Sequence, residues 1–194
     1  MGEMANNILL RGRPGSGKTT LAVGIAEALA REGWRIGGFV TEEIREGRSR
    51  IGFKIRDFRG EEAVLSHVSY GGTLRVGKYG VDVAAFESVA LRALRKGRQD
   101  ADLLVIDEVG RMETLSPAFR DLFMELMEED TPLLATLPSH EDPYVLALLR
   151  IPGIFVFMVT VGNRTGLKGV IEERLNGMLN ARKFSGELEG GIRS

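Results

Sequence analysis

Five short apolar runs recur along the chain, and each of them ends in a turn or a polar signal. Several are apolar throughout rather than alternating, which is typical of parallel strands that are buried on both faces. The pattern therefore predicts five main strands. They cover residues 6–12, 35–43, 102–108, 132–139 and 154–161.

Helical patterns lie between the apolar runs. Asp82 precedes a helical apolar face as an N-cap residue would, and Ser116 followed by Pro117 is a strong start signal for another helix. Because strands alternate with helices, the predicted fold class is α/β: a three-layer domain with right-handed crossovers around a mainly parallel central sheet. The expected helices cover residues 19–31, 83–94, 117–127, 141–149 and 164–181.

Residues 37–80 break this alternation. The segments 39–45 and 50–58 flank the sequence REGRSR and predict a β-hairpin. Short strand candidates follow at 64–68 and 74–79, with no long helix between them. We interpret this region as an antiparallel β-hairpin insert or extension on the main sheet.

Length and composition narrow the class of protein. A chain of 194 residues suits one well-packed domain, and we expect a single domain over residues 1–194 with a frayed tail at 185–194. Lys and Arg number 26 against 27 Asp and Glu, so the charge balance indicates neither direct nucleic-acid binding nor a membrane partner. No cysteine is present, which excludes disulfides and favours a cytoplasmic protein. The sequence leaves the oligomeric state unknown.

The sequence GRPGSGKTT follows the first predicted strand and opens the first predicted helix. It fits the pattern G-x-x-x-x-G-K-[ST], in which glycines let backbone N–H groups turn toward phosphate oxygens and the helix adds the positive end of its dipole. Lys18 is expected to reach the β- and γ-phosphates, and the Thr19 hydroxyl to ligate Mg²⁺. The predicted phosphate site comprises Gly12, Arg13, Pro14, Gly15, Ser16, Gly17, Lys18, Thr19 and Thr20.

The strand DLLVIDE supplies the second half of such a site. Asp107, at its end, is expected to hold Mg²⁺ opposite Thr19. Glu108 can face the γ-phosphate and orient or deprotonate a water for in-line attack. The alternative for Glu108 is an exposed loop glutamate, paired with Arg111.

Several stretches run in an order and spacing that together resemble one family: GRPGSGKTTL, GFVTEEIREGRSRIGF, VGKYGVD, VIDEVGRME, ATLP and VTVGNR. This family is that of the THEP1-type nucleoside-triphosphatases, small P-loop proteins that include a human cancer-related member. The resemblance implies a P-loop NTPase fold and slow hydrolysis of ATP, GTP and other NTPs to diphosphate and phosphate, with broad base tolerance. It also implies nucleotide-binding segments at residues 12–19 and 103–110, and the second of these includes Val109 and Gly110.

Three further side chains are candidates at the nucleotide. Arg111 follows a glycine and can swing toward the γ-phosphate, or it can form a salt bridge with Glu108 or Glu113. Asn163 and Arg164 follow the last predicted strand, near where a base lies in such folds. Arg164 can stack on the base or cap the next helix, and Asn163 can act as a plain N-cap.

Two other groups of residues are candidates for the site, and the sequence does not define their roles. Thr41, Glu42 and Glu43 end a predicted strand, whose C-terminal edge should face the crevice in which α/β proteins bind ligands. They either position water or a second ligand, or form a solvated acidic turn. Lys78 and Tyr79 belong to the family pattern, but the sequence assigns them no physical role.

Three functions compete at this stage. The favoured one is an NTPase that uses Mg²⁺ and an activated water. A nucleoside or nucleotide kinase would need an acceptor pocket and usually an Arg-rich lid, whereas residues 45–59 alternate like a strand. A nucleotide-dependent switch with slow hydrolysis is the third, and no basic, aromatic-rich stripe supports direct nucleic-acid contact.

Overall fold

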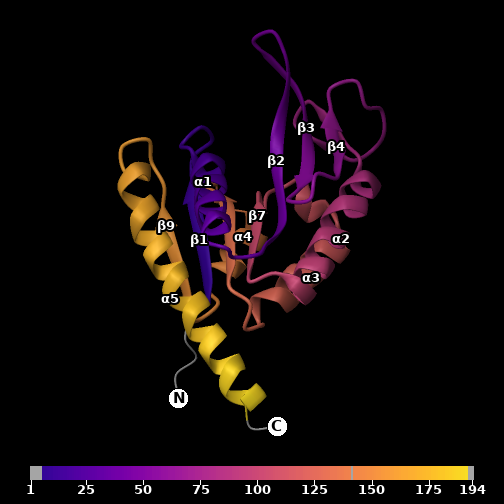
Figure 1. Cartoon of the computed structure of the whole chain (residues 1–194). Helices are drawn as coiled ribbons and strands as arrows, with labels where there is room; N and C mark the ends of the chain where they lie inside the picture. Colours follow the sequence, from indigo (N-terminus) through magenta and orange to yellow (C-terminus); the bar gives the residue numbers. More distant parts are fainter. Residues whose placement is uncertain (1–5, 141, 192–194) are drawn as a thin grey trace.

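The computed structural model describes residues 6–140 and 142–191. Within these residues, nine strands form one sheet in the order β5-β6-β4-β3-β2-β7-β8-β1-β9. Helices cover both faces of this sheet (Figure 1). The three-layer α/β fold that the sequence predicts is therefore confirmed.

The parallel part of the sheet consists of the five predicted strands. Neighbours in the order β2-β7-β8-β1-β9 pair in parallel, so their carboxyl ends meet at one edge of the sheet. The strands are β1 (Asn7–Gly12), β2 (Ile36–Glu46), β7 (Leu103–Asp107), β8 (Leu133–Pro138) and β9 (Ile154–Met158).

The helices divide between two buried cores. One face of the sheet packs against α1 (Lys18–Arg31) and α5 (Arg164–Gly191). The other face packs against α2 (Val83–Asp100), α3 (Pro117–Met127) and α4 (Pro143–Leu148), and the short helix η1 (Glu113–Leu115) precedes α3. In the part of the chain that the structure describes, no helix has the length and apolar character needed to cross a membrane.

Strand β7 shows why the predicted strands are apolar throughout. Leu103 and Val105 belong to the core with α1 and α5, while Leu104 and Ile106 belong to the core with α2 and α3. All four are fully buried, and each such side chain contributes roughly 1.5–3 kcal/mol of stability. The strand that ends at Asp107 is thus fixed from both sides.

Two helices begin at the predicted caps. The Asp82 carboxylate accepts a hydrogen bond of 2.9 Å from the backbone N–H of Ala85 at the start of α2. The Ser116 hydroxyl accepts one of 3.0 Å from the N–H of Phe119, and Pro117 occupies the first turn of α3. These bonds satisfy N–H groups that a helix cannot satisfy internally.

The remaining strands extend the sheet beyond β2. We call residues 36–81 the extension: β2 continues into an antiparallel ladder of β3 (Ser49–Asp57), β4 (Glu62–His67), β6 (Tyr79–Val81) and β5 (Arg75–Val76). The predicted hairpin is therefore confirmed. Figure 1 shows its tip rising past the level of α1.

Some boundaries differ from the sequence-based expectation. Strand β2 continues to Glu46, because antiparallel pairing with β3 on its other edge begins at Phe39 and goes on after pairing with β7 ends at Val40. The predicted strand 74–79 is two short strands, since Gly77 adopts a positive φ of 58° and turns the chain.

The helical predictions also need two corrections. Helix α5 extends beyond the predicted end at residue 181 to Gly191, because helical hydrogen bonding propagates at low cost once a packed helix exists. Helix α4 begins at Pro143 with Asp142 as its cap. The predicted start of this helix at Glu141 lies outside the described residues.

Candidate active site

The loop between β1 and α1 has a tight backbone that only glycine permits. A Cβ atom on Gly12 would lie 2.5 Å from the carbonyl oxygen of Val159 and 2.6 Å from the hydroxyl of Ser16. Gly17 has a φ of 92° and caps the helix in the left-handed conformation. Arg13, Pro14, Gly15 and Thr20 are exposed around the loop, and Ser16 is buried.

Lys18 begins helix α1 and is buried. Its Nζ donates a hydrogen bond of 3.1 Å to the carbonyl oxygen of Gly12, and it lies 3.5 Å from Oε2 of Glu108. The ammonium group therefore bridges the phosphate loop and the end of β7.

Asp107 is fully buried at the end of β7. Its Oδ1 accepts hydrogen bonds from the hydroxyls of Thr19, at 3.1 Å, and Thr136, at 2.5 Å. Burial raises the pKa of Asp107 to about 6, although both hydroxyls oppose this shift. Its Oδ2 is buried without a hydrogen-bond partner among the described residues.

Thr136 lies in β8 and went unrecognised in the sequence. The residue is fully buried in a strand that is otherwise apolar, and a buried hydroxyl needs a partner. A threonine inside the run PLLATLP was the available signal. Its partner, Asp107, is fixed only by the pairing of β7 with β8.

The loop after Asp107 places a carboxylate on each side of Gly110. The peptide bond between Asp107 and Glu108 is cis. A Cβ atom on Gly110 would lie 3.0 Å from Oε1 of Glu108 and 3.1 Å from Oε2 of Glu113. Val109 points into the core and its N–H donates to the carbonyl oxygen of Thr136. Val109 thus anchors the loop that carries Glu108.

Glu113 is a second buried carboxyl group that sequence reasoning assigned no site role. It is buried, and its Oε2 accepts a hydrogen bond of 3.1 Å from the N–H of Gly110. Burial, reinforced by the nearby charge of Glu108, raises the pKa of Glu113 to about 8. The group is therefore mainly protonated at neutral pH.

Arg111 lies away from both expected carboxylates. Its side chain is 61% exposed, and its Nε is 3.9 Å from Oδ2 of Asp142. The ion pair with Glu108 or Glu113 that the sequence allowed is replaced by this contact, because Glu108 pairs with Lys18 and Glu113 with the Gly110 N–H.

Asn163 and Arg164 act on the loop that precedes α5. The Asn163 amide accepts from the N–H of Thr160 at 2.8 Å and donates to the carbonyl oxygen of Met158 at 2.9 Å, so it fastens the loop behind it. A Cβ atom on Gly17 would lie 2.7 Å from Nη1 of Arg164. The Arg164 guanidinium therefore lies against the phosphate loop itself.

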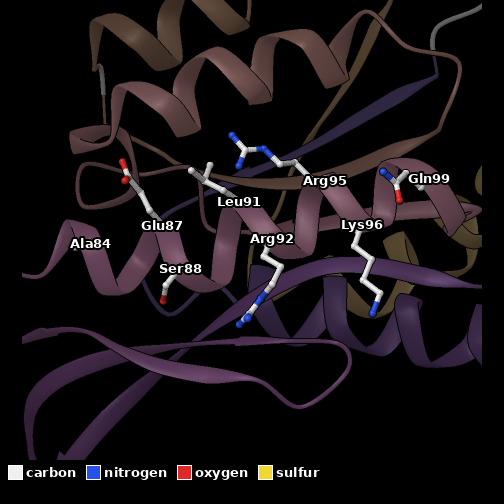
Figure 2. A pocket seen from close by; sticks show the side chains of 8 residues that line it. All are labelled: Ala84, Glu87, Ser88, Leu91, Arg92, Arg95, Lys96 and Gln99. Atoms are coloured by element: carbon white, nitrogen blue, oxygen red, sulfur yellow. The ribbon is translucent and has the colours of Figure 1, made fainter.

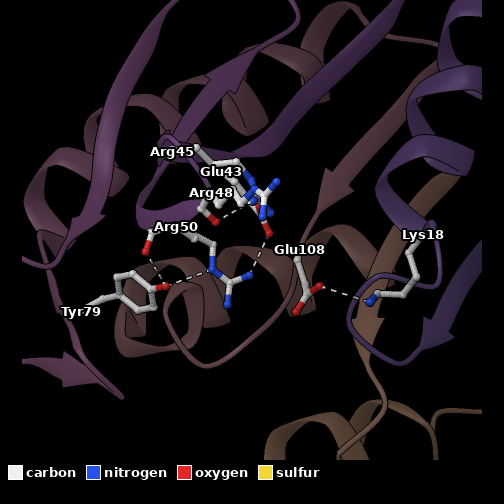
Figure 3. A network of polar contacts seen from close by, with 7 residues as sticks. All are labelled: Lys18, Glu43, Arg45, Arg48, Arg50, Tyr79 and Glu108. Atoms are coloured by element: carbon white, nitrogen blue, oxygen red, sulfur yellow. Dashed lines mark hydrogen bonds and ion pairs between the residues drawn. The ribbon is translucent and has the colours of Figure 1, made fainter.

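The acidic residues of β2 lie inside the strand rather than at its end, where the sequence placed them. Glu42 pairs with Arg56 and Lys54 across the hairpin. Glu43 pairs with Arg45 through one carboxylate oxygen and with Arg50 through the other. Figure 3 shows this second cluster together with Lys18 and Glu108.

A shallow surface hollow lies elsewhere. Figure 2 shows it along α2, where Arg92, Arg95 and Lys96 line it together with Glu87. None of its lining residues belongs to the phosphate loop or follows β7. It therefore takes no part in the site described above.

A glycine loop between a strand and a helix, with a buried lysine beside Glu108 and a threonine hydroxyl bonded to Asp107, defines the class of P-loop nucleotide-binding proteins. The model of a family described as NTPase matches residues 7–171 of the chain. The chain therefore belongs to this NTPase family, and the resemblance that its sequence motifs indicate is confirmed.

Relatives support the same assignment. The chain is 42% identical over 163 residues to nucleoside-triphosphatase THEP1 of Thermofilum pendens, which covers 82% of this chain and 90% of that protein. It is similar to the crystal structure of THEP1 from Aquifex aeolicus, with a TM-score of 0.80, 35% identity and coverage of 87% of this chain and 98% of that one. It is also similar to the solution structure of a human cancer-related nucleoside triphosphatase, with a TM-score of 0.77, 33% identity and coverage of 88% and 97%.

Proposed function

We propose that this protein hydrolyses nucleoside triphosphates to nucleoside diphosphate and phosphate, with Glu108 as the group that activates water. The observation that carries the proposal is the 3.5 Å contact between Glu108 and Lys18. Lys18 is the residue that binds the β- and γ-phosphates in such loops. A carboxylate this close to it is within reach of a water behind the γ-phosphorus. The names of the relatives point to the same reaction.

The proposed step transfers one proton and breaks one bond. The Glu108 carboxylate accepts a proton from water while the water oxygen forms a bond to the γ-phosphorus. The bond between the γ-phosphorus and the β–γ bridging oxygen breaks, and its electrons remain on the diphosphate. Lys18 and the loop N–H groups balance the charge on the phosphate oxygens. Glu108 then returns its proton to solvent.

Mg²⁺ is part of this proposal, held by Thr19 and Asp107. The residues fit a hard cation, because Oδ2 of Asp107 is buried and unpartnered and burial disfavours its negative charge. No cluster of three or more His, Asp or Glu side chains suited to a metal occurs in ranges 6–140 and 142–191. Mg²⁺ commonly takes few protein ligands and completes its shell with waters and phosphates. When bound, it neutralises phosphate charge.

We further propose a broad tolerance for the nucleotide base. The groups that define the site are the loop backbone, Lys18, Asp107 and Glu108, and all of them address phosphates, water or the metal. Arg164 is the candidate for contact with the base, and stacking by a guanidinium does not select one base over another.

Phosphate release tests the reaction. ATP, GTP, CTP and UTP are each incubated with Mg²⁺, with and without a panel of nucleosides and nucleoside monophosphates. We expect phosphate release that needs no acceptor. Transfer to an acceptor with little free phosphate would identify a kinase and refute the hydrolase.

The Glu108→Gln variant tests the mechanism. Loss of general-base help should lower kcat about a hundredfold or more, while binding of the triphosphate persists because Lys18 and the loop remain. Glu46→Gln, an exposed glutamate at the end of β2, is the matched control and should hydrolyse like the wild type. If Glu108→Gln turns over as fast as the control, Glu108 is not the general base.

A further inference from the structure

Arg50 is held in one orientation by side chains of the extension. Its Nε donates a hydrogen bond of 2.9 Å to the hydroxyl of Tyr79, and its Nη1 donates one of 2.8 Å to Oε1 of Glu43. The guanidinium carbon lies 5.0 Å from the centre of the Phe53 ring, within the range of a cation–π contact. An arginine fixed by three neighbours is prepared for a specific contact.

These contacts direct Arg50 toward the base of the hairpin. Arg50 lies near the tip, where it pairs with Arg45 next to a β-bulge. Its guanidinium, however, lies at the pair formed by Glu43 and Phe53, which is further from the tip. Bulges of this kind re-aim side chains beside functional sites. The side chain therefore runs from the tip back toward the carboxyl ends of the parallel strands.

The register of β2 places the residues that hold this guanidinium beyond the end of β7. Val40 pairs in parallel with Asp107, so β2 continues beside the point at which β7 ends. Glu43 lies three residues further, about 10 Å along the strand. In the view of Figure 3, Glu108 is drawn between Lys18 and Arg50. A terminal phosphate held by Lys18 would lie beside Glu108, near the point at which β2 passes the end of β7.

Arg50 also keeps donors for a ligand. Its side chain is 42% exposed, and its Nη2 makes no hydrogen bond within the described residues. A guanidinium has five N–H donors in a planar fork that matches a phosphate. Tyr79 takes the Nε–H and Glu43 takes Nη1, so the Nη2 amino group remains to donate to phosphate oxygens.

We propose that Arg50 is a catalytic residue that binds the terminal phosphate of the nucleotide and stabilises the charge that develops on it during transfer. Glu43 and Tyr79 are its positioning residues. The inference rests on the proposed triphosphatase function. It also gives a physical role to Tyr79, which the sequence could not explain, because the Tyr79 hydroxyl fixes Nε of Arg50.

Arg111 is the competing candidate for the same role. Its only ion pair within the described part of the chain is the 3.9 Å contact with Asp142, and its side chain is more exposed than that of Arg50. A preorganised donor stabilises a transition state better than one that must first be ordered. The structure therefore favours Arg50.

The experiment compares Arg50→Ala with Arg111→Ala and with Arg48→Ala, an exposed arginine of the same hairpin. For each variant, kcat for phosphate release is measured with Mg²⁺ and ATP. The affinities for ADP alone and for ADP with aluminium fluoride, a mimic of the phosphoryl group in transfer, are measured in parallel.

For Arg50→Ala we expect kcat and the affinity for the ADP–aluminium fluoride complex to fall together, by about 10²–10³-fold. The affinity for ADP alone should stay at the wild-type value, which a merely structural role would not predict. Tyr79→Phe keeps the ring and loses one hydrogen bond to the charged group, so kcat should fall about tenfold. Arg48→Ala should behave like the wild type.

Three results would overturn the proposal: Arg50→Ala matching Arg48→Ala, a loss of ADP affinity that parallels the loss of kcat, or the large loss occurring in Arg111→Ala instead. If Arg50→Ala does not fold, Arg50→Lys carries the same test, because lysine keeps the charge but cannot offer the planar fork.

A separate measurement keeps this inference distinct from the proposed function. If the wild type releases no phosphate from any triphosphate, the triphosphatase proposal fails. Affinities for ADP and for a non-hydrolysable ATP analogue then decide on Arg50. If Arg50→Ala lowers only the affinity for the analogue, the proposed contact between Arg50 and the terminal phosphate is supported. If it lowers neither affinity, the contact is refuted.

Discussion

The pKa values of carboxyl groups are shifted in opposite directions in the phosphate site and in the extension. Burial raises the pKa of Asp107 to about 6 and that of Glu113 to about 8. In the extension, a hydrogen bond from Arg56 lowers the pKa of Glu42. For Glu43, burial acts against ionisation, but Arg50 and Arg45 outweigh it and lower the pKa.

The difference shows two ways of fixing a polar group. Around the phosphate loop, Asp107 and Glu113 are buried away from water without a basic side chain of the described residues bonded to them, so a bound cation would stabilise their ionised forms. In the extension, arginine side chains already form ion pairs with Glu42 and Glu43. The carboxyl groups of the first region can therefore accept a bound cation, whereas Glu42 and Glu43 of the extension are already paired with basic side chains.

The largest effect is expected where the two regions share a core. Phe39 of β2 is fully buried, with its ring 5.7 Å from that of Phe86 and 5.9 Å from that of Phe119. Phe39→Ala should lower the free energy of unfolding by about 3–5 kcal/mol, as measured by urea denaturation. Val68→Ala, at an exposed site of the same region, should cost less than about 0.5 kcal/mol. Equal costs would mean that the extension is not part of the cooperative core.

Next in size is the removal of the buried cation. Lys18→Ala should reduce kcat/KM for ATP by about 10²–10³-fold and weaken triphosphate binding, which calorimetric titration measures. Lys54→Ala removes a cation that is already matched by Glu42 and Glu62, so it should bind ATP like the wild type. A similar loss of ATP binding in both variants would contradict the proposed difference between the phosphate site and the extension.

The pH dependence of stability should differ in sign between Glu113 and Glu43. The folded-state pKa of Glu113 lies near 8, above the ordinary 4.5. The wild type therefore loses stability relative to Glu113→Gln as the pH rises from about 4.5 to 8, by about 1.4 kcal/mol per pH unit. Urea unfolding at several pH values measures this difference. Parallel curves for the two proteins would contradict it.

Glu43→Gln provides the opposite case in the same measurement. Its pKa is lowered in the folded protein, so its contribution is present above the ordinary value of 4.5 and disappears as the pH falls through the folded-state pKa. This variant should therefore be less stable than the wild type at neutral pH and equal to it in acid. A variant that is destabilised equally at all pH values would show a different cause.

The smallest effect is expected for a single exposed ion pair. A double-mutant cycle on Lys54 and Glu42, which lie 3.3 Å apart, should give a coupling energy of about 0.2–1 kcal/mol that weakens in high salt. The single variants Lys54→Met and Glu42→Gln complete the cycle. A larger coupling energy that does not change with salt would show that this pair behaves like a buried ion pair and would contradict the prediction.

Much of this fold follows from local rules. The five apolar runs give the parallel strands, and Asp82 and Ser116 mark two helix starts because capping depends on residues two or three positions away. The phosphate loop is equally legible, since its chemistry is confined to nine consecutive residues. Asp107 follows from the strand before it.

The remaining site residues depend on contacts between distant segments. Thr136 meets Asp107 only through the pairing of β7 with β8, 29 residues apart, and Arg50 meets Tyr79 across the same separation. Glu113 is buried because η1 folds back on Gly110. The register between strands that are distant in the sequence depends on the whole sheet, so these partners emerge only from the folded protein.

The two edges of the sheet are protected unequally against unwanted association. Strand β5 has only two residues, and very short edge strands offer little backbone to a foreign chain. Strand β9 has five residues, and its Val156 and Met158 are 41% and 53% exposed. Under heat or at high concentration, aggregation by strand addition therefore starts more readily at β9, and a charged residue in place of Met158 would act as a gatekeeper there.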